Sequence, residues 1–266
     1  MGGSLEHANW FMTVLFCAMS AVIVASVVLA QRGRAMFIRP IPGLAAIDEA
    51  VGRATEMGRP MFFSTGLHGI TIVTLQALAI LAHIVRLAAA HATRLIVATA
   101  SSTLLPVAEE SVREAYAAAG RPESYRADDV RFVSDDQFAY ALGSIGIMAR
   151  DRTATNFFFG SFFAEALVLT ENGRALGALQ VAGCPDPTQI PFFIATCDYV
   201  VIGDEYYAAS AYLTREPTLT GSLVGQDIVK AAIILLVLVG AAIATYLGAG
   251  DAGAHNALLK LLAQGG

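Results

Sequence analysis

The sequence predicts an α/β fold: a Rossmann-like, mostly parallel sheet flanked by helices, with one transmembrane helix at each end. Three observations predict it. Hydrophobic residues make up 56% of the 266 residues and charged residues only 15%, against roughly 25% charged residues in typical soluble domains. Long uncharged runs lie near both ends of the chain. Between them, short apolar runs alternate with helical patterns, which is typical of βαβ units.

The first predicted transmembrane helix covers residues 10–31 and follows an outer tail over residues 1–9. The run from Trp10 to Ala30 carries no charge, and it has the roughly 20 residues that cross a bilayer. Glu6 and His7 precede this run, where a signal peptide would have a basic region. We therefore expect the helix to be retained.

The second predicted transmembrane helix covers residues 228–247. Lys230 lies in its first turn, from which a long side chain can reach the membrane interface. The following tail, residues 248–266, contains the leucine-rich run HNALLKLLAQ. This run favours a short amphipathic helix on the outer membrane surface or on a partner, and a frayed end is the alternative.

Charge placement predicts the topology. Arg32, Arg34 and Arg39 follow the first span, whereas the outer tails offer only Lys260. The positive-inside rule then places the central domain, residues 35–220, in the cytoplasm and both termini outside.

The run from Ile70 to Ala90 is also apolar. Gln76, His83 and Arg86 interrupt it near one face, and a charge at mid-membrane costs about 2.5–3.5 kcal/mol on insertion scales. We expect a buried helix of the central domain, and a third span is the alternative.

The central domain is predicted to contain six or seven strands and the helices between them. Asp48 and Glu49 suit the positive N-terminus of the first helix, Gly58 and Gly120 end two helices, and Pro217 breaks the last. Apolar strands such as MFF, LIV and FFF suit a sheet that is buried on both sides. In chain order, the predicted elements are strand 36–38, helix 47–57, strand 60–64, helix 70–90, strand 94–99, helix 105–119, strand 130–133, helix 137–150, strand 156–159, helix 163–172, strand 179–182, a loop over 184–191, strand 198–202 and helix 205–213.

The turns after these strands are the candidate binding site, because ligands of open α/β sheets lie beyond the carboxyl ends of the strands. A small ligand, nucleotide-like in size and polarity, could bind there. The alternative is that these small polar residues only cap helices. The candidate ligand-binding residues are Ser64, Thr65, Gly66, Ser101, Ser102, Asp135, Gly160, Ser161, Glu165, Asp204 and Glu205.

No catalytic residue, metal site or cofactor is predicted. No GxGxxG follows the first predicted strand, and the patterns GxxxxGK[ST] and GxSxG are absent, so the dinucleotide, P-loop and nucleophile-elbow fingerprints are not met. His68 lies at a turn and suits an exposed capping residue better than an acid or base. The three cysteines are widely spaced and suggest neither a disulfide framework nor a zinc site. A net charge of −5 without a basic cluster argues against nucleic acid.

Four segments resemble an uncharacterised prokaryotic membrane protein family that carries a domain of unknown function. The resemblance implies a membrane-tethered α/β domain in a prokaryotic inner (cytoplasmic) membrane, and it implies no activity and no catalytic residue. The segments are DEAVGRATEMGRP at 48–60, FFFGSFFAEA at 157–166, CDYVVIGDEYYAASAYLTREP at 197–217 and GSLVGQD at 221–227.

These features favour a membrane-anchored scaffold or interaction module that self-associates into a larger assembly. Its expected partners are membrane lipids, further copies of the chain and other membrane proteins, and no nucleic acid. Small residues in the spans, such as Ala21, Ala25 and Gly240, would allow close helix packing. The alternative is a membrane-tethered sensor or enzyme domain that binds a nucleotide-like or other small ligand. A transporter is disfavoured, because two spans offer no intramembrane ionisable pair.

Overall fold

The computed structural model describes residues 10–34, 41–214 and 217–248. The chain divides into two compact units. One unit is the central domain, residues 39–214, and the other combines the segments on both sides of it. The tails and the strand predicted over residues 36–38 lie outside the described residues.

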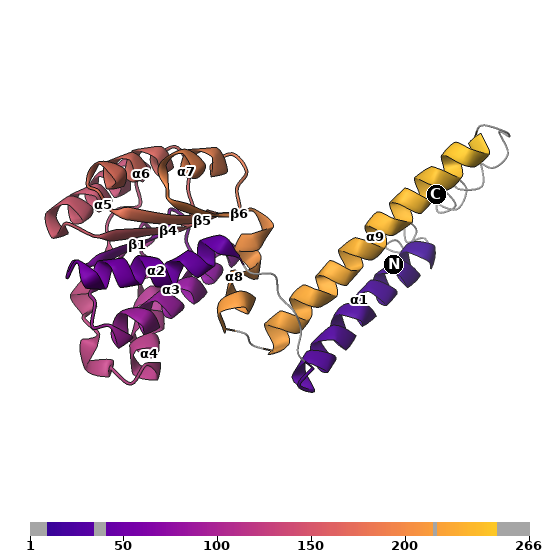
Figure 1. Cartoon of the computed structure of the whole chain (residues 1–266), viewed down its shortest axis with the longest axis horizontal. Coiled ribbons are helices and arrows are strands. Elements are labelled where there is room, and N and C mark those ends of the chain that lie inside the picture. The colour runs from indigo at the N-terminus through magenta and orange to yellow at the C-terminus, as the bar shows by residue number, and fades with distance from the viewer. Residues whose placement is uncertain (1–9, 35–40, 215–216, 249–266) are drawn as a thin grey trace, which may run out of the picture. The chain divides into compact units, whose positions relative to one another are not determined.

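The central domain contains a six-stranded sheet in the order β3-β2-β1-β4-β5-β6, and every neighbouring pair is parallel (Figure 1). This confirms the predicted α/β class and the parallel sheet. The strands are β1 (Met61–Gly66), β2 (Leu95–Thr99), β3 (Val130–Phe132), β4 (Thr155–Ser161), β5 (Leu179–Cys184) and β6 (Tyr199–Ile202).

Helices cover both faces of the sheet (Figure 1). One face carries α2 (Pro42–Glu56), α3 (Ile72–Ala90), α4 (Leu105–Ala118) and α8 (Asp204–Thr214). The other carries α5 (Gln137–Asp151), α6 (Glu165–Ala175) and α7 (Ile190–Thr196). Two short 3-10 turns, Pro122–Ser124 and Ala127–Asp129, precede β3.

Phenylalanines of the two central strands fill the core on both sides of the sheet. Phe62 and Phe158 belong to a buried cluster that includes Tyr140 of α5. Phe63 and Phe159 stack with 6.1 Å between their ring centroids. All four phenylalanines are fully buried, which is the double-sided burial that the apolar strands predict.

Two helix boundaries differ from prediction because proline starts a helix well. Its fixed φ suits the first turn, where its missing N–H has no partner to lose. Helix α2 begins at Pro42 rather than Ile47, and α7 begins at Ile190, with Pro191 in its first turn, inside the predicted loop over 184–191. The loop prediction was therefore wrong for its last residues.

Helix α3 is a buried helix of the central domain. Ile80, Leu81 and Ile84 are fully buried, and the hydroxyl of Tyr206 donates a hydrogen bond to the carbonyl of Val73 over 2.8 Å. By length and composition alone, three helices of the described chain could cross a membrane: Thr13–Gln31, Ile72–Ala90 and Pro217–Ala242. Packing against the sheet accounts for the apolar residues of the second.

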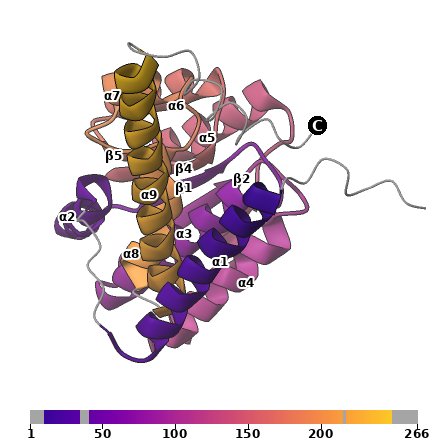
Figure 2. The same cartoon turned by 90° about the vertical axis from the view of Figure 1, so that its right-hand side faces the viewer.

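The remaining unit is an antiparallel pair of helices, α1 (Trp10–Gln31) and α9 (Pro217–Gly248) (Figure 2). We call this pair the α1–α9 hairpin, although the central domain separates the two helices in the sequence. The backbones meet at two glycines of α9. A Cβ on Gly221 would lie 2.7 Å from the Cα of Val27, and one on Gly225 would lie 2.9 Å from the Cα of Ile23. Helix α9 thus begins at Pro217 and not at residue 228, and its two glycines, four residues apart, permit close packing against α1.

Candidate functional site at the carboxyl edge of the sheet

The strand order reverses between β1 and β4. From β1 the chain proceeds to β2 on one side, and from β4 it proceeds to β5 on the other. In doubly wound sheets the ligand crevice lies at this point, beyond the carboxyl ends of the strands. The candidate site therefore centres on the turns after β1 and β4.

Backbone atoms form the base of this site. Gly66 pairs with Ser161 after a register shift, and the N–H of Leu67 donates to the carbonyl of Ser161 over 2.9 Å. A Cβ on Gly66 would lie 2.3 Å from the oxygen of Ser161, and a Cβ on Gly160 would lie 2.1 Å from the oxygen of Thr65. Only glycine permits so close an approach of the two chains.

Ser64 and Thr65 face the interior of the domain rather than a ligand. Both are fully buried. Ser64 Oγ accepts a hydrogen bond from the N–H of Gly66 over 3.3 Å and lies 2.6 Å from the hydroxyl of Tyr140, which donates to the carbonyl of Ala98 over 3.2 Å. Burial raises the pKa of Tyr140, so its phenol stays protonated. These hydrogen bonds connect β1, β2 and α5.

Glu165 is a fully buried carboxylate in the first turn of α6. Its Oε2 accepts from Nε2 of Gln137 over 2.6 Å, and its Oε1 accepts from the N–H of Phe163 over 2.9 Å. No Lys, Arg or His among the described residues forms an ion pair with it. The two donors and the positive end of α6 stabilise its charge.

The turn after β2 lies against the turn after β1. A Cβ on Gly69 would be 3.2 Å from Ser101 Oγ and 3.3 Å from Thr103 Oγ1. Ser102 is exposed beside them. Across the reversal point, the ring of exposed His68 meets the ring of Phe163 edge-on, with centroids 5.4 Å apart. The structure thus gathers the predicted residues of β1, β2 and β4.

Three predicted residues lie away from this group. Asp135 is exposed after β3, at one end of the sheet, and Asp204 and Glu205 follow β6, at the other. With strands spaced about 4.8 Å apart, β3 and β6 are separated by roughly 24 Å, so one small ligand cannot contact both.

Helix capping was the alternative to ligand binding for the polar residues of these turns. It accounts for Asp136, whose side chain accepts hydrogen bonds from the N–H groups of Phe138 and Ala139. It does not account for the turns before α4 and α6, because neither helix has a side-chain cap.

The charge on this edge is negative. The turns over 66–71, 100–104, 133–136, 161–164 and 185–189 contain Asp135, Asp136 and Asp186 but no Lys or Arg. A phosphate would depend on backbone N–H groups alone. The edge suits a neutral or cationic small molecule better than a polyphosphate.

The sequence analysis missed a network of charged side chains at the amino ends of the strands, on the side of the sheet opposite to the candidate site. Arg94 donates to both oxygens of the buried Asp129 and pairs with Asp151 at 3.4 Å. Arg59 donates to the carbonyls of Arg152 and Thr153. The sequence signal for this network is a charged residue just before each strand: Arg59 before β1, Arg94 before β2 and Asp129 before β3. Cavities of about 380 and 210 Å³ open here, but these two arginines are already engaged in structural bonds.

Comparison with known proteins identifies the family. A model described as "Domain of unknown function (DUF6754)" matches residues 4–253. The chain belongs to this family. No curated protein and no solved structure matches it. This agrees with the resemblance to an uncharacterised family.

Cys184 and Cys197 are weak nucleophiles in this family member. Burial raises the pKa of Cys184, and it raises the pKa of Cys197 to about 12, so both thiols stay protonated near neutral pH. Within residues 10–34, 41–214 and 217–248, no group of three or more His, Cys, Asp or Glu side chains could hold a metal ion.

Proposed function

We propose that this chain is a membrane-anchored interaction module, with the α1–α9 hairpin in the bilayer and the central domain on the cytoplasmic side. In this account, copies associate through the outer surface of α5, α6 and α7. We call this surface the α5–α7 face. Its exposed apolar side chains are Phe138, Leu142, Leu167, Val168, Phe192 and Ile194.

Helix packing in the hairpin supports the anchor. Small residues at four-residue spacing are typical of close helix contacts in membranes, and Gly221 and Gly225 meet α1 in this way. Outside this contact α9 presents large apolar side chains, with Leu235 and Leu238 more than 60% exposed, which lipid would cover. Arg32 and Arg34 follow α1 directly and favour a cytoplasmic central domain.

The observation that carries self-association is the small number of charges among the apolar side chains of the α5–α7 face. Helix α5 has no charged residue before Arg150 and α7 has none, whereas α6 exposes Glu171 and Arg174. Leu142 is 67% exposed and Phe138 and Ile194 are each 56% exposed. A surface helix normally shows polar residues to solvent, as α4 does with Glu110, Arg113 and Glu114.

The character of this face favours a second copy over lipid as its occupant. Peripheral binding to an anionic membrane needs Lys or Arg around the apolar residues, and α5, α6 and α7 together provide only Arg150 and Arg174. A largely apolar face with few charges is compatible with itself across a two-fold axis. Anchoring also confines copies to one plane, which raises their effective concentration.

Light scattering of the full-length chain in mild detergent tests this function. The native chain should have the mass of two or more copies, and Leu142→Glu should reduce it to one, because a charge would be buried in the contact. Ala117→Glu, on the exposed side of α4, is the matched control and should leave the mass unchanged. A monomeric native chain would contradict the proposal.

A second candidate function is small-ligand binding at the reversal point between β1 and β4. The strand order and the buried Glu165 favour it. Thermal unfolding of the full-length chain with nucleotides, amines and divalent cations tests it, since a ligand at a hundred times its Kd adds about 2.7 kcal/mol. No stabilisation across this panel would count against a ligand site.

A further inference from the structure

The exposed surface of α5 changes from acidic to apolar to basic along the helix. Asp135 and Asp136 come just before α5, and both are exposed. From Gln137 to Ala149 the helix carries no charge, and Arg150 follows with 68% of its side chain exposed. The two kinds of charge therefore lie at opposite ends of one apolar surface.

This apolar surface has a bulky residue and a hollow at equal distances from Leu142. Phe138 lies four residues before Leu142 and Gly146 four residues after it, so all three lie on one side of the helix. They are exposed. A Cβ on Gly146 would have nothing within 4 Å, whereas one on Gly143 would lie 2.4 Å from Cγ1 of Val133. Gly146 is thus an open position on the outer surface, and a side chain of another molecule can enter it.

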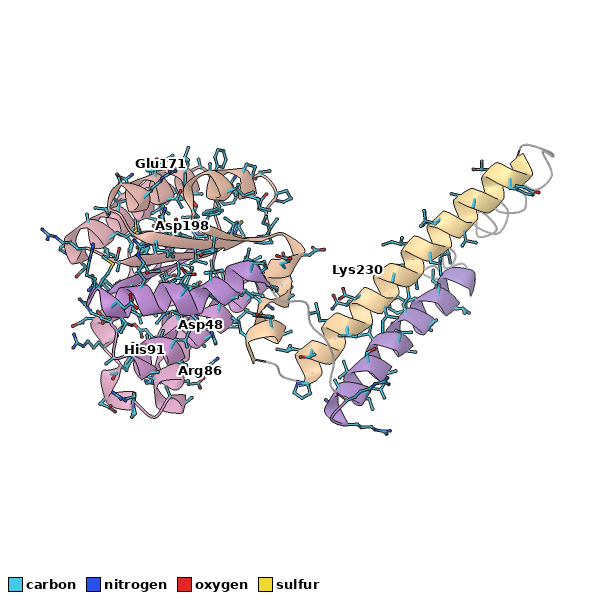
Figure 3. The ribbon with its side chains drawn as sticks, viewed as in Figure 1. Asp48, Arg86, His91, Glu171, Asp198 and Lys230 are labelled. Atoms are coloured by element: carbon cyan, nitrogen blue, oxygen red, sulfur yellow. The ribbon has the colours of Figure 1, made fainter. Side chains whose placement is uncertain are left out.

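Helix α6, beside α5 on this face, is less suited to form the centre of a contact. Figure 3 shows Glu171 on the outer surface of α6. Arg174 is also exposed, and its Nη1 donates to the carbonyl of Ala195 over 3.2 Å. Burying these two charges at the middle of an interface would cost desolvation. The uncharged part of α5 has no such cost.

We infer that α5 packs antiparallel against α5 of a second copy, with Leu142 on the two-fold axis. The inference rests on the proposed self-association through the α5–α7 face. Such an axis pairs residues at equal distances before and after Leu142. Phe138 of each copy then fills the hollow at Gly146 of the other.

Charge determines the direction of the two helices. Asp135 lies seven residues before Leu142 and Arg150 eight after it, so the antiparallel arrangement brings each aspartate to the arginine of the other copy. A parallel arrangement would place like charges together, which is costly at an interface. Nη2 of Arg150 lies 3.7 Å from Oδ2 of Asp151 in its own chain. The guanidinium has five N–H donors, and its exposure leaves others for the second copy.

Light scattering of the full-length chain in mild detergent tests the hollow. Gly146→Leu should reduce the native mass to that of one copy, because the new side chain occupies the space that Phe138 of the other copy enters. The variant should unfold no earlier than the native chain, since leucine favours a helix more than glycine does. Gly52→Leu in α2 is the matched control. Its Cβ position is also open, and it should keep the native mass.

Cysteine cross-linking in native membranes tests the position of the axis. In the full-length Cys17→Ser chain, oxidation should link Leu142→Cys to itself, because the axis brings the two Cα atoms within the roughly 4.4–6.8 Å that a disulfide requires. Ala149→Cys is the matched control. It lies seven residues from the axis in each copy, which at 1.5 Å per residue separates the two cysteines by about 21 Å. It should give only the background of the parent chain.

Charge reversal in trans tests the pairing between copies. Asp135→Arg and Arg150→Glu, each added to the Leu142→Cys chain, should lower cross-linking about tenfold when expressed alone, because like charges then meet. Expressed together with different tags, the two variants should restore cross-linking as a mixed dimer, because each pair is again opposite in charge. A variant that failed to fold would not be rescued in this way.

Three results would overturn the inference: a native mass for Gly146→Leu, equal cross-linking at positions 142 and 149, or no recovery in the mixed expression. If the native chain still has the mass of two or more copies and Leu142→Glu has the mass of one, these results leave self-association through the α5–α7 face standing. A monomeric native chain would contradict both the proposed function and this contact.

Discussion

At the scale of single residues, two glycines determine how β1 and β4 end. Gly66 has a φ of +76° and Gly160 a φ of +152°, and at both positions a Cβ would overlap a backbone oxygen of the other strand. The sequence analysis placed both glycines in candidate turns. It could not show that they touch, because strand order is set by contacts between distant residues. The same limit hid the burial of Ser64 and Thr65.

Gly66→Ala should lower the free energy of unfolding of the central domain by more than about 2 kcal/mol, since strain at positive φ adds to the clash with Ser161. Gly52→Ala is the control. It lies inside α2 with nothing within 4 Å of an added Cβ, so it should stabilise by about 0.5–1 kcal/mol. Denaturant unfolding of the full-length chain in detergent measures both. Equal changes in the free energy of unfolding for Gly66→Ala and Gly52→Ala would refute the close backbone contact at Gly66.

His83 should make stability depend on pH. Burial lowers its pKa below the ordinary 6.5, Asp48 at 3.9 Å opposes this shift, and Arg86 adds to it. Between pH 6.5 and the lower folded pKa, the unfolded chain binds a proton that the folded chain does not, so stability falls as pH falls through this window. In thermal unfolding from pH 7.5 to 5, His83→Gln should show a weaker decline than the native chain. Identical declines would rule out this role of His83.

At the scale of elements, composition and periodicity located most helices and strands within a few residues. The errors share a physical cause. Prolines were interpreted as stops or loop residues, whereas Pro42 and Pro191 lie in the first turns of helices. The second span was started at residue 228, whereas Gly221 and Gly225 belong to the same helix and lie at its contact with α1. Whether such a residue ends a helix or packs within it depends on its neighbours in space, which one sequence does not provide.

Gly225→Val should weaken the hairpin by about 1–3 kcal/mol, because the added side chain would enter the backbone of α1. Gly240→Val is the matched control on the same helix, where nothing lies within 4 Å of an added Cβ. Loss of helical circular dichroism on heating in detergent compares the two. The glycine contact would be disproved if both variants melted with the native chain.

At the scale of the whole molecule, the sequence predicted a parallel α/β domain and apolar terminal helices, and the structure and the family match agree with it. Strand order and the α5–α7 face could not be predicted, because Phe138, Leu142 and Ile194 have the composition of core residues. Only the fold shows that these three are exposed.

The most direct test of the central claim, self-association through the α5–α7 face, is cryo-electron microscopy of the full-length chain in lipid nanodiscs. We predict particles in which the α5–α7 faces of two copies meet, with Leu142 and Phe138 buried between them. Single copies, or copies that meet through α2, α3 and α4 and leave the α5–α7 face in solvent, would contradict the account.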